Sequence, residues 1–86
     1  MIVITSSKFD KQFKKQDQKI KDEFGIRVKM LMDDVNSQLL KAHKLSGKLK
    51  NLWSFNVSAD IRVIFDRNQK GVILLVAIGS HSELYE

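Results

Sequence analysis

Two short stretches with alternating polarity decide the fold of this chain: WSFNV at residues 53–57 and IRVIF at residues 61–65. In both stretches most apolar side chains recur at every second position, a period that is typical of a strand with one buried face. Residues 66–71 (DRNQKG) predict a turn, and residues 72–78 (VILLVAI) are apolar at every position. A strand without a polar face belongs inside a sheet, so we expect residues 72–78 to lie centrally.

Upstream of these strands, the apolar periodicity changes to that of helices. Residues 2–4 are β-branched and predict a short strand, and Ser7 with Asp10 fits a capping box at a helix start. One apolar stripe predicts a helix over residues 7–24, ended by Gly25, and a second stripe predicts a helix that ends at residues 40–43. The stripes consist of Phe9, Phe13, Ile20 and Phe24, and of Val28, Met32, Val35, Leu39 and Ala42. Residues 44–51 then form a basic loop.

Helices grouped before short strands indicate an α+β domain in the order β-α-α-β-β-β. In this fold a two-helix hairpin covers one face of a small, mainly antiparallel, curled sheet. We expect residues 1–86 to form one such domain. If the apolar side chains of the alternating strands face the helices, strand parity sends Asn56 and Arg62 to the opposite face, and His81 follows just after the last strand. That open face is a candidate anion site.

The composition is that of an ordinary globular domain, with 43% hydrophobic and 29% charged residues. The lack of cysteine argues against a disulfide-stapled secreted module. The longest apolar run, residues 72–78, is far shorter than the roughly 20 residues of a membrane helix, and the N-terminus lacks the basic region of a signal peptide. We therefore expect a cytoplasmic protein without a membrane partner.

The charge is positive and unevenly distributed. Fifteen Lys and Arg residues against ten Asp and Glu residues give a net charge of +5, and residues 35–59 contain no acidic residue. That stretch carries Lys41, Lys44, Lys48 and Lys50, together with His43. Charge of one sign on a small domain indicates a polyanionic partner, either nucleic acid or an acidic protein. A solvated lysine-rich face that only keeps the protein soluble explains the charge equally well.

Three stretches resemble the RelE/ParE superfamily of bacterial toxins: residues 40–50 (LKAHKLSGKLK), 52–65 (LWSFNVSADIRVIF) and 78–85 (IGSHSELY). The GSHSELY ending is similar to the YafQ branch of messenger-RNA endonucleases. This resemblance implies a toxin of a type II toxin–antitoxin module that cleaves mRNA on the ribosome without a metal or another cofactor. It also implies an acidic, partly disordered antitoxin as the cognate partner.

The resemblance further implies a set of site residues. YafQ-like members carry two histidines and an acidic residue that match His43, His81 and Asp60 here. RelE-like members carry an arginine and a tyrosine that match Arg62 and Tyr85. Asn56 stands where YafQ-like proteins carry a further histidine, and His81 stands where RelE carries an arginine. Because asparagine does not titrate, proton transfer falls more heavily on His81 and His43.

These residue types suit RNA cleavage without a metal. The reaction needs a base for the 2′-hydroxyl, an acid for the leaving 5′-oxygen and positive charge for the transition state. We expect His81 to be the main acid–base group and Arg62 to bind the phosphate, while His43 or Asp60 supplies the second proton transfer or orients an imidazole. Tyr85 stacks on a base or donates from its hydroxyl. The expected RNA-binding residues are Lys44, Lys48, Lys50 and Asn56.

Each assignment has a structural alternative. A histidine at a helix C-terminus is favourable through the helix dipole, an aspartate between strands is ordinary turn chemistry, and an arginine on a sheet can pair with a cross-strand acid. Two other functions also remain open: a ParE-like inhibitor of DNA gyrase that performs no chemistry, and a basic interaction module. With no cysteine and two separated histidines, we do not expect a zinc site.

Overall fold

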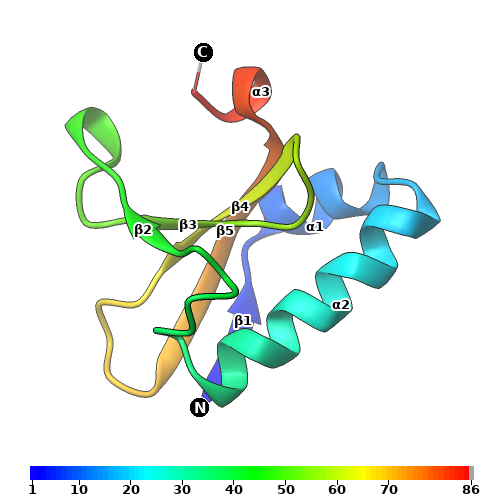
Figure 1. The fold of residues 1–86 in the computed structure, drawn as a ribbon. Helices are drawn as coiled ribbons and strands as arrows, with labels where there is room; N and C mark the ends of the chain where they lie inside the picture. The colour runs from blue at the N-terminus through cyan, green and yellow to red at the C-terminus, as the bar shows by residue number, and fades with distance from the viewer. Residues whose placement is uncertain (86) are drawn as a thin grey trace.

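The computed structural model describes residues 1–85 and contains a five-stranded sheet (Figure 1). The strands are β1 (Ile2–Thr5), β2 (His43–Lys44), β3 (Trp53–Asn56), β4 (Ile61–Asp66) and β5 (Val72–Ser80). The helices are α1 (Ser7–Lys14), α2 (Gln18–Asp33) and α3 (His81–Tyr85), with a 3-10 turn, η1, at Gly47–Leu49. The strand order is β1-β5-β4-β3-β2; β1 runs parallel to β5, and all other neighbours are antiparallel. This is the predicted α+β class.

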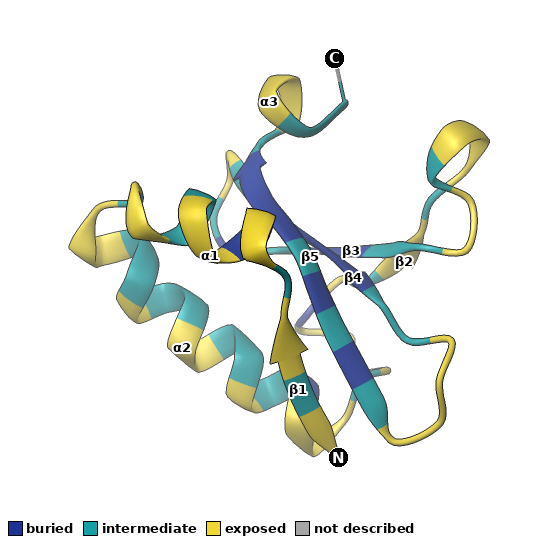
Figure 2. Ribbon diagram, turned by 180° about the vertical axis from the view of Figure 1, so that it is seen from behind, coloured by how far each residue is buried: buried dark blue, intermediate teal, exposed yellow. Residues whose placement is uncertain are grey.

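The apolar run at residues 72–78 lies inside the sheet, as predicted. It forms most of β5, which is hydrogen-bonded to β1 on one side and to β4 on the other, although the middle position of the five belongs to β4. Figure 2 shows buried and half-buried residues along β5, whereas the edge strand β1 is largely exposed. Interior placement explains why β5 has no polar face.

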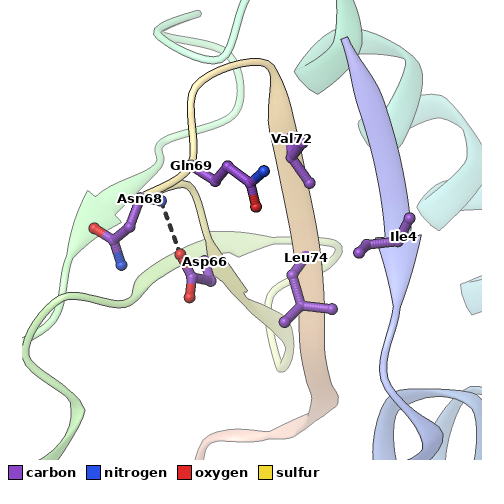
Figure 3. A pocket seen from close by; sticks show the side chains of 6 residues that line it. All are labelled: Ile4, Asp66, Asn68, Gln69, Val72 and Leu74. Carbon is purple, nitrogen blue, oxygen red and sulfur yellow. Dashed lines mark hydrogen bonds between the residues drawn. The ribbon is translucent and has the colours of Figure 1, made fainter.

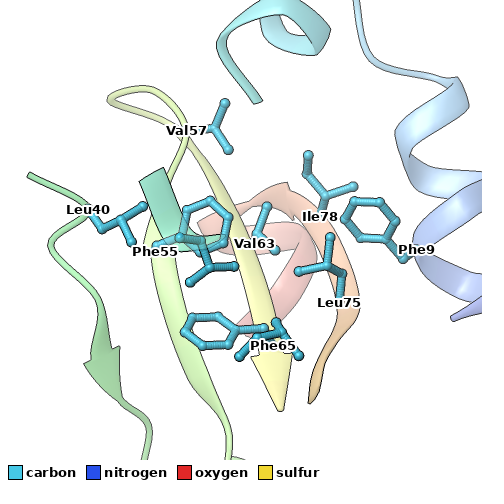
Figure 4. Packing of buried hydrophobic residues seen from close by; sticks show 10 residues of the cluster. Phe9, Leu40, Phe55, Val57, Val63, Phe65, Leu75 and Ile78 are labelled. Atoms are coloured by element: carbon cyan, nitrogen blue, oxygen red, sulfur yellow. The ribbon is translucent and has the colours of Figure 1, made fainter. Parts of the chain in front are cut away.

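The core lies between the sheet and the helices α1 and α2. Phe55 and Val63 are partners in the β3–β4 register, and the rings of Phe55 and Phe65 lie 5.6 Å apart. Phe9 reaches this cluster from α1 (Figure 4). The buried cluster consists of Phe9, Leu31, Leu40, Phe55, Val57, Val63, Phe65, Ile73, Leu75 and Ile78. Burial of each large side chain stabilises the fold by about 1.5–3 kcal/mol relative to exposure.

The first predicted helix is divided in two. α1 ends at Lys14, and α2 begins after Asp17, whose carboxylate accepts a hydrogen bond from the backbone N–H of Ile20 at 2.9 Å. This N-cap starts a new helix inside a stripe that the sequence suggested was continuous. The stripe itself is preserved because both helices face the core, with the rings of Phe13 and Phe24 only 4.9 Å apart. Gly25 lies within α2 and does not end a helix.

The second predicted helix ends earlier than expected. α2 ends at Asp33, and residues 34–42 form turns that lead into β2. Asp34 helps to end the helix, because its carboxylate accepts a hydrogen bond from the backbone N–H of Asn36 at 3.0 Å and stabilises a turn. Leu39 is therefore 72% exposed and does not belong to the core stripe.

Two local predictions also need correction. The N-cap of α1 is Ser6 and not Ser7: its hydroxyl accepts from the backbone N–H of Phe9 at 3.0 Å and donates to the Val76 carbonyl at 2.7 Å. The predicted basic loop at residues 44–51 is more ordered than expected. Its first residue belongs to β2, and η1 lies within it.

Candidate functional site

The face of the sheet that the helices leave free carries the polar site residues. Arg62 on β4 is the register partner of Asn56 on β3 and of Gly79 on β5, so these three residues form one row across the sheet. Val63 and Phe65 point into the helix-covered core, and strand alternation therefore sends Arg62 and Asn56 to the other side. This is the placement that strand parity predicted. His43, opposite Ser54, shares that face.

A shallow pocket of about 300 Å³ gathers most of the predicted catalytic residues. The short strand β2 supplies one wall with His43, the middle strand supplies Arg62, and α3 supplies His81 and Tyr85. Figure 1 shows the segment containing η1 and the helix α3 standing on either side of this end of the sheet. The lining residues are His43, Leu45, Ser46, Leu49, Arg62, His81 and Tyr85.

The short helix α3 is held by a capping box that the sequence interpretation missed. The backbone N–H of Ser80 donates to the Glu83 carboxylate at 2.8 Å, and the N–H of Glu83 donates to the Ser80 hydroxyl at 3.2 Å. The Ser80-x-x-Glu83 spacing is the sequence pattern that indicates it. The hydrogen bonds from Ser80 and the nearby charge of Lys15 hold the pKa of Glu83 below its ordinary value.

This helix places His81 and Tyr85 one turn apart. Their ring centroids lie 4.7 Å from each other, tilted by 54°. The absence of a side chain at residue 79 eases this packing: a Cβ there would lie 3.2 Å from the Glu83 carboxylate and 3.4 Å from Leu84, and these side chains would have to shift slightly. Gly79 thus leaves room for α3 to pack closely against the end of β5.

Among the described residues, the guanidinium of Arg62 makes one side-chain hydrogen bond and leaves its terminal nitrogens free. Its Nε donates to the Asn56 side-chain oxygen at 3.2 Å, which fixes the plane of the guanidinium. Within residues 1–85, no carboxylate lies close enough to Arg62 to form a salt bridge. The salt bridge found in this part of the chain joins Arg27 and Glu23. The terminal nitrogens of Arg62 are therefore available for bidentate contact with a phosphate.

His43 is exposed, and one of its ring nitrogens has a partner. Its Nδ1 lies 3.3 Å from the carbonyl oxygen of Lys41. Because a carbonyl can only accept, this hydrogen bond requires the proton on Nδ1, and Nε2 of the neutral ring is then free to take a proton. The backbone of Lys41 has a positive φ of 54°, a conformation that non-glycine residues adopt rarely.

Other predicted site residues lie outside this pocket. Asp60 is exposed in the turn between β3 and β4 and does not line it. Lys44 pairs with Trp53 in the register and so points to the opposite face from His43. Lys48 lines an adjoining hollow with Leu49, Leu84 and Tyr85. Lys50 is exposed next to η1 and lines neither cavity.

A second cavity of about 310 Å³ lies near the other end of β5 and has a different character. Figure 3 shows apolar side chains from β1 and β5 on one side and amides from the β4–β5 turn on the other, with Asp66 accepting from the backbone of Asn68. It contains neither histidine nor a basic side chain. In residues 1–85, no three His, Asp or Glu side chains cluster as metal ligands, and no helix is long and apolar enough to cross a membrane.

Comparison with known structures identifies the fold. YafQ from E. coli strain BL21(DE3) superposes with a TM-score of 0.83 at 16% identity, covering 98% of this chain and 97% of that one. A YoeB/ParE toxin from Agrobacterium tumefaciens gives 0.81 at 14% identity, covering 94% and 99%. The E. coli DinJ-YafQ toxin-antitoxin complex gives 0.77 at 18% identity, covering 98% and 96%. No sequence among the curated proteins matches.

The fold is therefore that of the RelE-like toxins of type II toxin–antitoxin systems. Residues 2–86 match the family described as "Bacterial toxin of type II toxin-antitoxin system, YafQ". The chain belongs to this YafQ family of toxins, in agreement with the resemblance seen in its sequence.

Proposed function

We propose that this toxin is an endoribonuclease that cleaves mRNA on the ribosome and thereby inhibits translation. One observation carries the proposal: His43, Arg62, His81 and Tyr85, from three separate segments of the chain, line a single pocket. Two imidazoles beside a guanidinium without a carboxylate partner suit the cleavage of a phosphodiester. A toxin that acts by binding alone does not need a titratable pair in one pocket.

The pocket residues account for each proton in the reaction. The 2′-oxygen attacks the adjacent phosphorus as His43 Nε2 takes its proton, and the bond from phosphorus to the 5′-oxygen breaks as protonated His81 donates a proton to that oxygen. The products are a 2′,3′-cyclic phosphate and a 5′-hydroxyl. Arg62 stabilises the negative charge on the non-bridging oxygens, with its guanidinium oriented by Asn56.

The remaining residues of this region bind the RNA. Tyr85 presents its ring at the pocket, where a splayed base can stack on it. Lys48 lies beside Tyr85 in the adjoining hollow and contacts the RNA backbone. Asp60 lies outside the pocket, so we assign the second proton transfer to His43 and not to Asp60.

An acidic antitoxin is the proposed cognate partner. The E. coli DinJ-YafQ toxin-antitoxin complex contains a toxin with this fold, and the net charge of +5 favours an acidic chain that folds on binding. A cytoplasmic location, where ribosomes and mRNA are found, follows from the proposed activity.

Induced expression with site variants tests the proposal. We expect the wild type to stop translation and cut mRNA within codons, as mapped by primer extension. We expect His81→Ala to lower the rate of cleavage by about 10²–10⁴-fold. Ser82→Ala, at the neighbouring exposed position, is the matched control and should stay fully active.

The same experiment separates the alternative functions. Filamentation with DNA damage and intact mRNA would indicate a gyrase inhibitor. This alternative is tested because the fold is also similar to that of a YoeB/ParE toxin. Normal growth would indicate a basic interaction module. Full toxicity of His81→Ala would contradict the acid–base role proposed for that residue.

A further inference from the structure

A buried hydroxyl without a hydrogen-bond partner lies next to the pocket. Ser54 on β3 is 0% exposed, and within residues 1–85 its Oγ makes no hydrogen bond. Strand alternation puts its side chain on the same face as Asn56, and the register pairs it with His43 on β2 and Ile64 on β4. An unpaired buried hydroxyl costs about 1–3 kcal/mol, and buried polar groups are rarely left without a partner, so a partner that the free chain does not engage would relieve this cost.

Of the two register partners of Ser54, His43 is the one whose side chain can supply this hydrogen bond. Ile64 is apolar, and the side-chain oxygen of Asn56 already accepts from Arg62. Directly opposite residues in an antiparallel pair have Cβ atoms about 4.5–5.5 Å apart, within reach of an imidazole and a hydroxyl. The His43 ring is exposed and is held by one long contact, 3.3 Å from Nδ1 to the Lys41 carbonyl. A surface hydrogen bond of this length is weak, so the ring can turn.

We propose that Ser54 is a positioning residue for His43. When RNA fills the pocket, the imidazole turns inward, and its Nδ1–H exchanges the Lys41 carbonyl for the Ser54 hydroxyl as acceptor. When the Ser54 oxygen accepts this hydrogen bond in place of the Lys41 carbonyl, the ring keeps its proton on Nδ1, and Nε2 stays available for the 2′-hydroxyl proton. The hydroxyl that is unpaired in the free protein is satisfied in the RNA complex, which favours the inward orientation there. The inference rests on the endoribonuclease function proposed above.

The variant Ser54→Ala separates positioning from a structural role. We expect kcat to fall about 10-fold, as is typical when the orienting partner of a histidine is removed, with KM nearly unchanged. The melting temperature should not fall, because the substitution removes an unpaired buried hydroxyl. Ser54→Thr keeps the hydroxyl and should retain most of the activity. In a His43→Ala background, Ser54→Ala should cause no further loss.

A second measurement does not depend on cleavage. Side-chain ¹⁵N NMR of His43 should show a change at Nδ1 when an uncleavable 2′-deoxyhexanucleotide is added to the wild type, and little change in Ser54→Ala. An active wild type with unchanged kcat in Ser54→Ala, or the same NMR response in both proteins, would overturn the positioning role. If the wild type cleaves no RNA, the proposed function fails, and the NMR comparison still decides whether His43 turns toward Ser54.

Discussion

The guanidinium of Arg62 combines a fixed plane with free terminal nitrogens, and its geometry should matter as much as its charge. Arg62→Lys keeps a positive charge but loses the fork that contacts two phosphate oxygens and the hydrogen bond to Asn56. We expect this variant to lower kcat by about 10²–10³-fold, the usual effect of losing one transition-state donor. Single-turnover cleavage of a short RNA on the ribosome measures the loss.

Arg67→Lys is the matched control for this change. Arg67 follows β4 and stacks over the Trp53 ring at 4.8 Å, outside the pocket. The control should keep wild-type kcat even if it lowers stability slightly. Equal losses in both variants would show that arginine at position 62 has only a structural role.

The position of Asp60 permits a clear choice between two candidate proton acceptors. Asp60 is exposed in a turn, whereas His43 lines the pocket with one ring nitrogen free. We expect Asp60→Asn to keep kcat within about two-fold of the wild type, while His43→Ala lowers it by about 10²–10⁴-fold. A larger loss in Asp60→Asn would reverse the assignment.

At the scale of elements, apolar periodicity predicted most of the side chains that face the core, but not where each helix ends. Two residues of the second predicted stripe, Met32 and Leu39, are 47% and 72% exposed. Phe9, Phe13 and Phe24 share one aromatic cluster as their spacing indicated, even though they lie on two helices. Asp17, the N-cap of α2, divides the predicted helix in the middle of the apolar stripe. Apolar periodicity did not reveal this break, because the apolar side chains on both sides of Asp17 still face the core. The capping pattern at Asp17 could have predicted it.

The capping box of α3 should make this helix sensitive to acid. The pKa of Glu83 lies below its ordinary value of 4.5, chiefly because the backbone N–H of Ser80 donates to the ionised carboxylate. The stabilisation is therefore complete above about pH 4.5 and is lost as the pH falls through the lowered pKa. We expect the amide signal of Ser80 to titrate in this range.

Glu83→Gln provides the control for this prediction. Glutamine can accept the same hydrogen bond but carries no titrating charge, so the Ser80 amide should stay unchanged from pH 6 to pH 3. An NMR titration of both proteins makes the comparison. If Ser80 titrates identically in the two proteins, another group controls α3.

At the scale of the whole molecule, the sequence predicted the positions of candidate site residues that follow from the alternation of side chains along a strand. It was less informative for residues whose positions depend on tertiary packing. Strand parity placed Arg62 and Asn56 on the free face, since side-chain direction in a strand is local. His43 reaches that face through a two-residue strand that no local pattern distinguishes from a loop. Ser54 was also missed, because an alternating strand predicts a solvent-facing serine there, whereas its side chain is fully buried.

The overall charge predicts how RNA binding should respond to salt. Binding to a single strand releases counterions, so log K should fall linearly with log salt concentration, by about 0.7 for each phosphate contacted. Lys48 lies beside Tyr85, whereas Lys44 points to the opposite face of the sheet. We therefore expect Lys48→Gln to reduce the slope by about 0.7 and Lys44→Gln to leave it unchanged. Fluorescence anisotropy with the His81→Ala protein, which should not cleave its ligand, measures both slopes. A slope near zero in the parent protein would rule out a phosphate-dominated contact, and a reduction by Lys44→Gln alone would place the RNA on the other face.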